Sequence, residues 1–191
     1  MKSNKPVDVI YLDFAKAFDC VVHTKLLYKL KLYDIGNMIL KWLENFLIGR
    51  SQCVRVANSF SKIFPELSGV PQGSIFGPVL FLIYINDICT SSQQPNVKLK
   101  LFADDVKLYS DVYSTSDDNL QICLNKIVMW ADLWQLKLSH SKCSVLSIGK
   151  SMINTVYKIN DTKLLKDVSN TDLGVEIDSF LLFDQHYIDK T

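Results

Sequence analysis

Three aspartates are the residues of this sequence best suited to chemistry. Asp13 ends a short apolar run, and Asp104 and Asp105 stand together between the apolar segments 98–103 and 106–110. Carboxylate oxygens are the ligands that hard cations such as Mg²⁺ take, usually with room left for substrate phosphates. Two such ions can activate a hydroxyl and stabilise a leaving pyrophosphate in an in-line displacement. If the three carboxylates meet, the sequence predicts this chemistry, for which no catalytic Ser, Cys or His is needed.

The elements around the aspartates decide whether the carboxylates can meet. Residues 7–14 are rich in β-branched side chains and predict a buried strand that ends at Asp13. Segments 98–103 and 106–110 predict two strands with Asp104 and Asp105 at the turn between them. A turn that leaves both carboxylates in water is the alternative for an isolated Asp-Asp pair. A strand 7–14 beside this hairpin would instead bring all three to one edge of a sheet.

The other periodic segments define the fold class. They predict helices at 24–32, 37–48, 78–88 and 116–138, and strands at 52–57 and 143–148. Ser116 offers an N-cap for the long helix, and Asp117 and Asp118 suit its first turn. This order indicates an α+β domain with helices on one face of a mainly antiparallel sheet.

Composition bounds the function. The 191 residues are 48% apolar and 21% charged, which is typical of a globular protein, and the net charge of +1 does not indicate an extended grip on a nucleic-acid backbone. The longest apolar stretch, 75–85, contains Gly77 and Pro78 and is too short to span a bilayer. The N-terminus lacks the apolar run of a signal peptide. We expect an intracellular protein of the cytoplasm or nucleus, without a membrane partner.

Other kinds of site find little support. Five cysteines lie far apart without a CxxC pair, so free thiols are expected rather than a zinc site. The spacing of the three histidines, among them His186, suggests no triad. Neither a P-loop nor a Gly-x-Gly-x-x-Gly pattern occurs, so triphosphate binding would rest on metals and backbone amides.

Three blocks, taken in order, resemble reverse transcriptases of retrotransposons without long terminal repeats. They are residues 9–19 (VIYLDFAKAFD), 68–78 (SGVPQGSIFGP) and 101–105 (LFADD). The resemblance covers about residues 7–187 and implies a polymerase palm-like sheet with helices on one face, part of the fingers, and no thumb. It places the palm and partial fingers in 1–165 and a truncated approach to the primer grip and thumb in 166–191. Within the latter, Asp172 stands where the family more often has Tyr.

The resemblance also implies roles for single residues. Asp13, Asp104 and Asp105 would be catalytic and would hold two Mg²⁺ ions, with Mn²⁺ as an alternative. Lys142, in a block at 136–143, would lie near the triphosphate as a proton donor to pyrophosphate; a solvated surface lysine is the alternative. Phe18 would exclude a ribose 2′-hydroxyl, with core packing as its alternative. The nucleotide-binding residues would be Phe14, Phe18, Gln72 and Gly73.

The function implied is RNA-directed DNA polymerisation by a transposable element. Its partners would be an RNA template, a DNA primer and deoxynucleoside triphosphates. We expect this stretch to be a fragment that binds template-primer poorly, because fingers and thumb carry much of the basic surface and a longer chain would supply them. A catalytically inactive remnant, acting at most as a weak nucleic-acid or protein-binding module, is the first alternative. Another palm-type nucleotidyltransferase or cyclase is the second, and those enzymes lack the 68–74 block.

Overall fold

The computed structural model describes residues 6–112, 118–149 and 155–182. Contacts divide the chain into two compact units, which are described one at a time. The first comprises Met1–Ala15, Ile88–Ala131 and Leu138–Thr191, and the second comprises Lys16–Asp87 and Asp132–Lys137. The predicted N-cap Ser116, the first-turn residue Asp117 and the histidine His186 lie outside the described residues.

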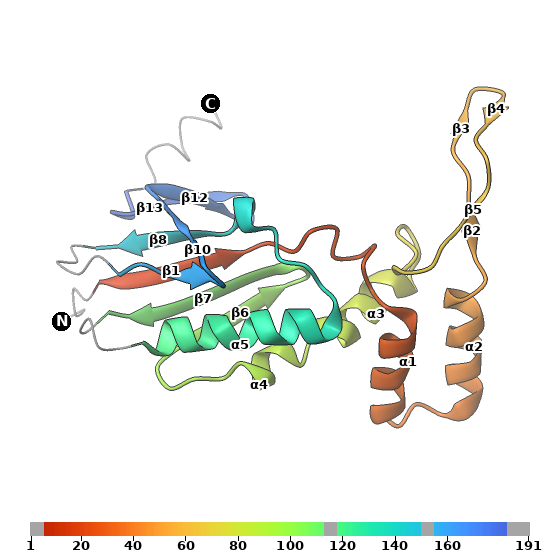
Figure 1. Cartoon of the computed structure of the whole chain (residues 1–191), viewed down its shortest axis with the longest axis horizontal. Coiled ribbons are helices and arrows are strands. Elements are labelled where there is room, and N and C mark those ends of the chain that lie inside the picture. The colour runs from red at the N-terminus through yellow and green to blue at the C-terminus, as the bar shows by residue number, and fades with distance from the viewer. Residues whose placement is uncertain (1–5, 113–117, 150–154, 183–191) are drawn as a thin grey trace. The chain divides into compact units, whose positions relative to one another are not determined.

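A five-stranded sheet forms the centre of the first unit (Figure 1). Its middle strand, β1 (Val7–Leu12), pairs antiparallel with β7 on one side and β8 on the other. The strand order is β11-β8-β1-β7-β6, and only β11 and β8 run parallel. The other four strands are β6 (Lys98–Phe102), β7 (Asp105–Asp111), β8 (Ser144–Ile148) and β11 (Leu165–Asp167).

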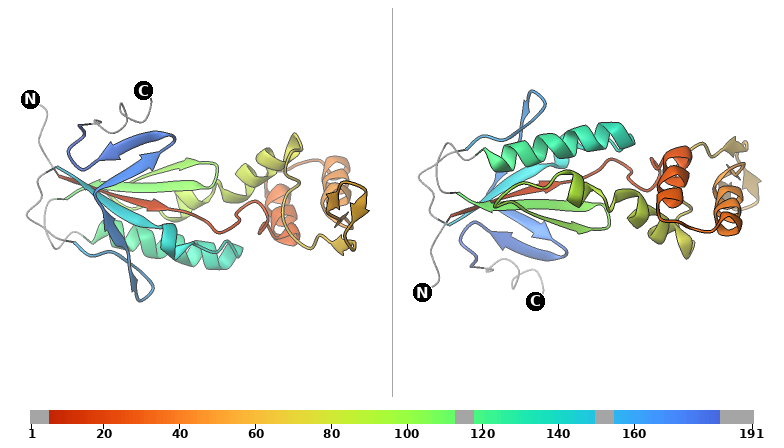
Figure 2. Two further views of the ribbon diagram at one scale, coloured as in Figure 1. Left: turned by 90° about the horizontal axis from the view of Figure 1, so that it is seen from above. Right: turned by 90° about the horizontal axis from the view of Figure 1, so that it is seen from below.

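Helices cover one face of this sheet. Helix α5 (Asn119–Trp134) crosses that face, and the short α4 (Ile88–Ser91) lies on the same side (Figures 1 and 2). Ile10 and Leu108 of the sheet and Leu124 and Ile127 of α5 are fully buried. Complete burial of each such side chain stabilises the fold by roughly 1.5–3 kcal/mol. This core fixes the sheet that carries Asp13 and Asp105.

Two small hairpins complete the first unit. The β12 (Ser169–Asp172) and β13 (Val175–Asp178) hairpin lies on the face of the sheet opposite α5 (Figure 2). Strands β9 (Lys158–Ile159) and β10 (Thr162–Lys163) form the other. One face of the sheet is therefore packed on helices, and the other is left for the β12–β13 hairpin.

The second unit contains three helices and a β-hairpin arm. Helix α1 (His23–Leu32) packs against α2 (Asn37–Leu47) and α3 (Phe76–Ile85). The arm consists of two short ladders: β2 (Ser51–Gln52) pairs with β5 (Phe64–Pro65), and β3 (Arg55–Val56) pairs with β4 (Ser59–Phe60).

A buried cation joins the helices of the second unit. Lys29 of α1 is almost fully buried, and its ammonium donates hydrogen bonds to the Tyr84 carbonyl and, at 2.6 Å, to Asp87 Oδ1. The same nitrogen lies 3.6 Å from the centre of the Trp134 ring. Burial lowers the pKa of Lys29, and the hydrogen bond and charge of Asp87 oppose that shift. The partners offset the cost of removing this charge from water.

The structure confirms the predicted fold class and corrects details. The single strand predicted at 52–57 is divided between β2 and β3. The helix predicted at 78–88 begins at Phe76, because Gly77 and Pro78 fit a first turn, and it ends at Ile85 before α4. Within the described residues, no helix is long and apolar enough to cross a membrane.

Candidate active site

Strand pairing brings Asp13 and Asp105 to the same sheet edge. Leu12 of β1 is the partner of Val106 on β7, so extending this antiparallel register by one residue sets Asp13 opposite Asp105. Phe102 and Asp105 are the last partners of the β6–β7 hairpin, which leaves Ala103 and Asp104 as its two-residue turn. The predicted adjacency of strand 7–14 and the hairpin is confirmed, and this pairing brings Asp13 and Asp105 next to each other.

The turn itself is strained. Ala103 has a φ of 51°, in the left-handed region that an alanine adopts at a cost of roughly 1–2 kcal/mol. Two-residue hairpins favour such a conformation at this position, but they usually place Asn, Asp or Gly there. The hairpin holds Ala103 in it, and Asp104 follows directly in the turn.

Negative charge accumulates at this edge. Burial is the main cause of a raised pKa for Asp105, and the charges of Asp104, Asp13 and Asp172 raise it further. The ammonium of Lys107 lowers it. Three neighbouring carboxylates thus disfavour ionisation of Asp105, which is the situation that a bound cation relieves.

Asp13 has an oxygen that lacks a hydrogen bond. Its Oδ2 atom is buried and accepts none from the described residues, although the Lys142 ammonium lies 3.2 Å away as an ion pair. The Asp13 carbonyl accepts a hydrogen bond of 2.8 Å from the backbone of Ser139. That bond fixes the start of η1 (His140–Lys142) beside Asp13, so the structure places Lys142, 129 positions further along the chain, next to the first carboxylate.

The donor set fits a hard divalent cation by its chemistry. It offers carboxylate oxygens, one of them buried without a hydrogen bond, and a surplus of negative charge. As the side chains are placed, however, no group of three or more His, Cys, Asp or Glu residues in the described part of the chain encloses a point where one ion could sit. The two predicted magnesium ions therefore stay a prediction.

A cavity of about 890 Å³ opens beside the carboxylates. Tyr11 of β1, Asp13 just after that strand, Asp105 and Lys107 of β7, and Asp172 of the β12–β13 hairpin all line it. The Lys107 ammonium donates a hydrogen bond to Asp172 Oδ2, and both side chains are largely buried. Burial, with a smaller contribution from Asp172, raises the pKa of Tyr11 to about 12. The ion pair ties the hairpin to the sheet next to Asp105.

Two predicted nucleotide-binding residues lie on the loops of the second unit. Phe18 is half-buried and stacks on Phe81, with ring centres 4.1 Å apart. The side-chain amide of Gln72 is exposed, and its Nε2 donates a hydrogen bond of 2.7 Å to Asp19 Oδ1. The stacking on Phe81 covers part of the Phe18 ring. The hydrogen bond to Asp19 directs the Gln72 Nε2 toward that carboxylate and the amide oxygen away from it.

The loop 68–74 is held by the segment that follows Asp13. Val70 donates a backbone hydrogen bond of 2.9 Å to the Phe18 carbonyl, and His23 Nε2 lies 2.7 Å from the Gly69 carbonyl oxygen. Gly73 has a φ of 80°, but no atom of the described residues lies within 4 Å of the place a Cβ would take. The close approach occurs at Gly77, where a Cβ would meet the Pro71 carbonyl oxygen at 2.4 Å.

Phe14 is the predicted site residue with the least accessible side chain. It is 2% exposed and packs on Trp130, with ring centres 6.5 Å apart. Its backbone forms an isolated bridge with Leu138. The Phe14 side chain therefore belongs to the core of the first unit.

Two side-chain pairings, one in each unit, could not be predicted from the sequence. Asp19 lies within the block at 9–19, where the resemblance gives it no role, and no motif includes Lys107. The one signal in the sequence for the Lys107–Asp172 pair is that Asp172 stands where the family more often has Tyr. An acid at an unusual position suggests that a basic side chain lies near it in the folded chain. Lys107 and Asp172 are 65 positions apart, so no local pattern links them.

Comparisons with known proteins agree with this geometry. The family model for "Reverse transcriptase (RNA-dependent DNA polymerase)" matches residues 2–177. The chain is 28% identical over 184 residues to the RNA-directed DNA polymerase from mobile element jockey of Drosophila melanogaster, which covers 92% of this chain and 20% of that protein. It is 30% identical over 190 residues to the probable RNA-directed DNA polymerase from transposon X-element of the same species, covering 94% and 20%.

A solved structure shares the fold. The structure of apo telomerase from Candida tropicalis, truncated from its C-terminal domain, superposes with a TM-score of 0.66 over 94% of this chain and 35% of that one. At 13% sequence identity, the likeness concerns the fold alone. The present chain spans about a fifth of the length of the curated relatives it matches.

Proposed function

This chain belongs to the reverse transcriptase (RNA-dependent DNA polymerase) family, and from that premise we propose that it is the catalytic palm of an RNA-directed DNA polymerase. The reaction is nucleotidyl transfer from a deoxynucleoside triphosphate to a primer 3′-hydroxyl on an RNA template. The observation that supports the proposal is the β1–β7 register, whose last pair, Leu12 and Val106, directly adjoins Asp13 and Asp105, with Asp104 in the next turn.

The carboxylates are the proposed metal ligands. Asp13, Asp104 and Asp105 would hold two Mg²⁺ ions, with Mn²⁺ as an alternative. When bound, such ions activate the attacking hydroxyl and stabilise the leaving pyrophosphate. The buried Oδ2 of Asp13, which accepts no hydrogen bond from the described residues, and the raised pKa of Asp105 support this choice.

Further residues of both units are proposed to take supporting roles. Lys142 is proposed to lie near the triphosphate and to donate a proton from its Nζ to the pyrophosphate. Its ion pair with Asp13 holds the ammonium beside that carboxylate. Phe18 is proposed to exclude the ribose 2′-hydroxyl by contact, with its ring held by Phe81. Gln72 and Gly73 are proposed to lie beside the incoming nucleotide, Phe14 to contribute backbone only, and Asp19 to position the Gln72 amide.

Primer extension on an RNA template with Mg²⁺ tests the proposal. Three proteins are compared: the 191-residue chain, a longer chimera carrying fingers and thumb segments of a relative, and that chimera with Asp104→Asn. We expect extension by the chimera that falls at least about a thousandfold in Asp104→Asn, because a lost metal ligand removes transition-state stabilisation of several kcal/mol. Asp161→Asn, an exposed acid in the β9–β10 turn, serves as the matched control.

The same experiment separates the alternative. Equal activity in the Asp104→Asn chimera would contradict the assignment of the carboxylates. Silence of all three proteins, each shown to be folded by circular dichroism, would favour an inactive retrotransposon remnant that at most binds nucleic acid or protein weakly.

A further inference from the structure

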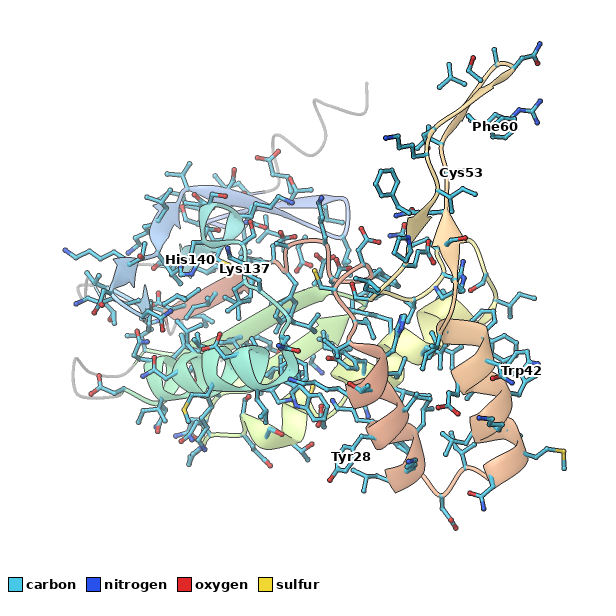
Figure 3. The ribbon with its side chains drawn as sticks, turned by 45° about the vertical axis from the view of Figure 1, so that its right-hand side comes forward. Tyr28, Trp42, Cys53, Phe60, Lys137 and His140 are labelled. Atoms are coloured by element: carbon cyan, nitrogen blue, oxygen red, sulfur yellow. The ribbon has the colours of Figure 1, made fainter. Side chains whose placement is uncertain are left out.

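The hairpin arm, residues 51–65, is the most exposed part of the second unit. Each of its fifteen residues is exposed. The arm extends beyond α2 and carries Cys53 and Phe60 (Figure 3). Its apolar members are exposed by more than half, among them Val54, Val56, Phe60, Ile63 and Phe64. The arm therefore has no apolar face covered by the rest of its unit.

Such an arm is expected to have a partner. Two ladders of two residue pairs each and the hydrogen bonds between Val54 and Ser61 hold it together, and an isolated two-stranded hairpin is marginally stable in water. The register also shifts by one residue between the ladders. Three residues separate Ser51 from Arg55 on the first strand, whereas four separate Phe60 from Pro65 on the second. The extra residue is a bulge, which increases strand twist and disfavours edge-to-edge pairing with another sheet.

The charge of the arm indicates the kind of partner. Arg55 and Lys62 lie within it, and the sequence has no acidic residue between Glu44 and Glu66. Glu66 at the base of the arm is paired with Arg50, with Nε and Oε2 3.5 Å apart. In a chain whose net charge is +1, this leaves a purely cationic segment that complements a polyanion.

One pair near the tip is already arranged for stacking. Arg55 and Phe60 are direct cross-strand partners, and the guanidinium carbon lies 5.5 Å from the centre of the ring. Arg55 Nε donates a hydrogen bond of 2.9 Å to the Ala57 carbonyl, which fixes the guanidinium beside the turn. Phe60 remains 65% exposed. Aromatic rings and guanidinium planes of this kind stack on unpaired bases and contact the adjoining phosphates.

We propose that the arm binds unpaired RNA, with Phe60 stacking on a base and Arg55 and Lys62 contacting phosphates. The inference rests on the proposed function, since the RNA in question is the single-stranded part of the template and the arm is its docking surface. It deepens that function by naming the segment involved, and it requires no catalysis by this chain.

Two measurements on the 191-residue chain test the arm. The first is the affinity for a fluorescent unstructured RNA oligonucleotide at low salt, by anisotropy. We expect Phe60→Leu, which keeps an apolar side chain without an aromatic face, to weaken binding at least about fivefold. The double variant Arg55→Gln/Lys62→Gln should weaken it about tenfold or more and reduce the slope of log Kd against log salt by about one to two. Lys41→Gln, an exposed cation of α2, is the control and should leave the affinity nearly unchanged.

The second measurement uses the thiol of the arm itself. Cys53 is exposed, so its alkylation rate with and without RNA reports contact at the arm, and half-buried Cys20 is the internal reference. RNA should slow the alkylation of Cys53 and leave that of Cys20 unchanged. Absence of RNA binding, or binding with Cys53 unprotected and the variants unaffected, overturns the inference. So does a loss of self-association in Phe60→Leu without loss of RNA binding, since the arm would then serve a second copy of the chain. Failure of primer extension alone would instead concern the proposed function.

Discussion

The sheet edge that carries the aspartates and the hairpin arm are both built around antiparallel hairpins, yet they are stabilised in opposite ways. The β6–β7 hairpin is paired to β1 and covered by α5, and its buried side chains fix where Asp104 and Asp105 stand. The arm at 51–65 has two short ladders and no buried side chain. The packed element thus holds its carboxylates in fixed positions, as the proposed chemistry requires, and the exposed arm is the element for which we propose a partner.

The same substitution in both regions gives the largest expected contrast. Ile10 of β1 is fully buried and Ile63 of the arm is 73% exposed. Ile10→Ala should lower the free energy of unfolding by about 2–5 kcal/mol, and Ile63→Ala should change it by less than about 0.5 kcal/mol. Urea unfolding followed by circular dichroism measures both. A cost above about 1 kcal/mol for Ile63→Ala would mean that the arm is packed against protein in solution, contrary to its exposure in the structure.

Thiol reactivity provides the second contrast. Burial raises the pKa of Cys123 to about 11 and also raises that of Cys143, whereas Cys53 of the arm is exposed. A rise of about two pKa units leaves about a hundredfold less thiolate at pH 8, and burial slows access further. Mass spectrometry after timed iodoacetamide treatment should find Cys53 alkylated and Cys123 and Cys143 intact. Comparable rates under native conditions would show that the sheet core opens readily, and unfolding in urea should make the rates equal.

A smaller contrast concerns ion pairs. Lys107 and Asp172 have side chains that are 30% and 15% exposed, and Lys41 and Glu44 of α2 have side chains that are 71% and 42% exposed. Double-mutant cycles with alanine should give a coupling energy of about 1–2 kcal/mol for the first pair and about 0.3–0.5 kcal/mol for the second. Equal couplings would mean that the β12–β13 hairpin is not held to the sheet by this pair.

Local signals in the sequence account for what could be predicted. The apolar segments on either side of Asp104 and Asp105 indicated β6 and β7, and β-branched residues indicated β1. The predicted turn was wrong by one residue, because the two-residue turn is Ala103 and Asp104 and Asp105 already pairs with Phe102. Once β1 pairs with β7, the register decides which residues lie opposite each other, so Asp13 and Asp105 meet at one edge of the sheet. Only the first half of the arm was predicted, as one strand at 52–57, since alternation there says nothing about a bulge or about the strand that pairs with it. Nor could any local pattern link Lys107 to Asp172 or Lys29 to Asp87, since these partners meet only in the folded chain.

The smallest predicted effect tests whether the carboxylate edge is electrostatically strained. Because burial and neighbouring carboxylates raise the pKa of Asp105, the native state retains a proton that the unfolded chain loses between the ordinary value of 3.8 and the raised one. The unfolded state binds fewer protons in that window, so the contribution of Asp105 to stability falls as pH rises through it. At pH 7 without divalent ions, Asp105→Asn should therefore unfold with a slightly higher free energy than the unmodified chain, by less than about 1 kcal/mol because the side chain is partly solvated.

Acidity and magnesium should both erase this advantage of Asp105→Asn. Lowering the pH through the window protonates Asp105 in the unmodified chain and removes the repulsion. Millimolar Mg²⁺ should stabilise the unmodified chain through its carboxylates and the variant less, which reverses the order of stability. Thermal unfolding at pH 7 with EDTA, at pH 4 with EDTA, and at pH 7 with Mg²⁺ measures all three states, with Asp161→Asn as the matched exposed acid. If Asp105→Asn were less stable than the unmodified chain in EDTA at pH 7, the carboxylate would be stabilising the fold, and the charge surplus that favours a cation at this edge would not exist.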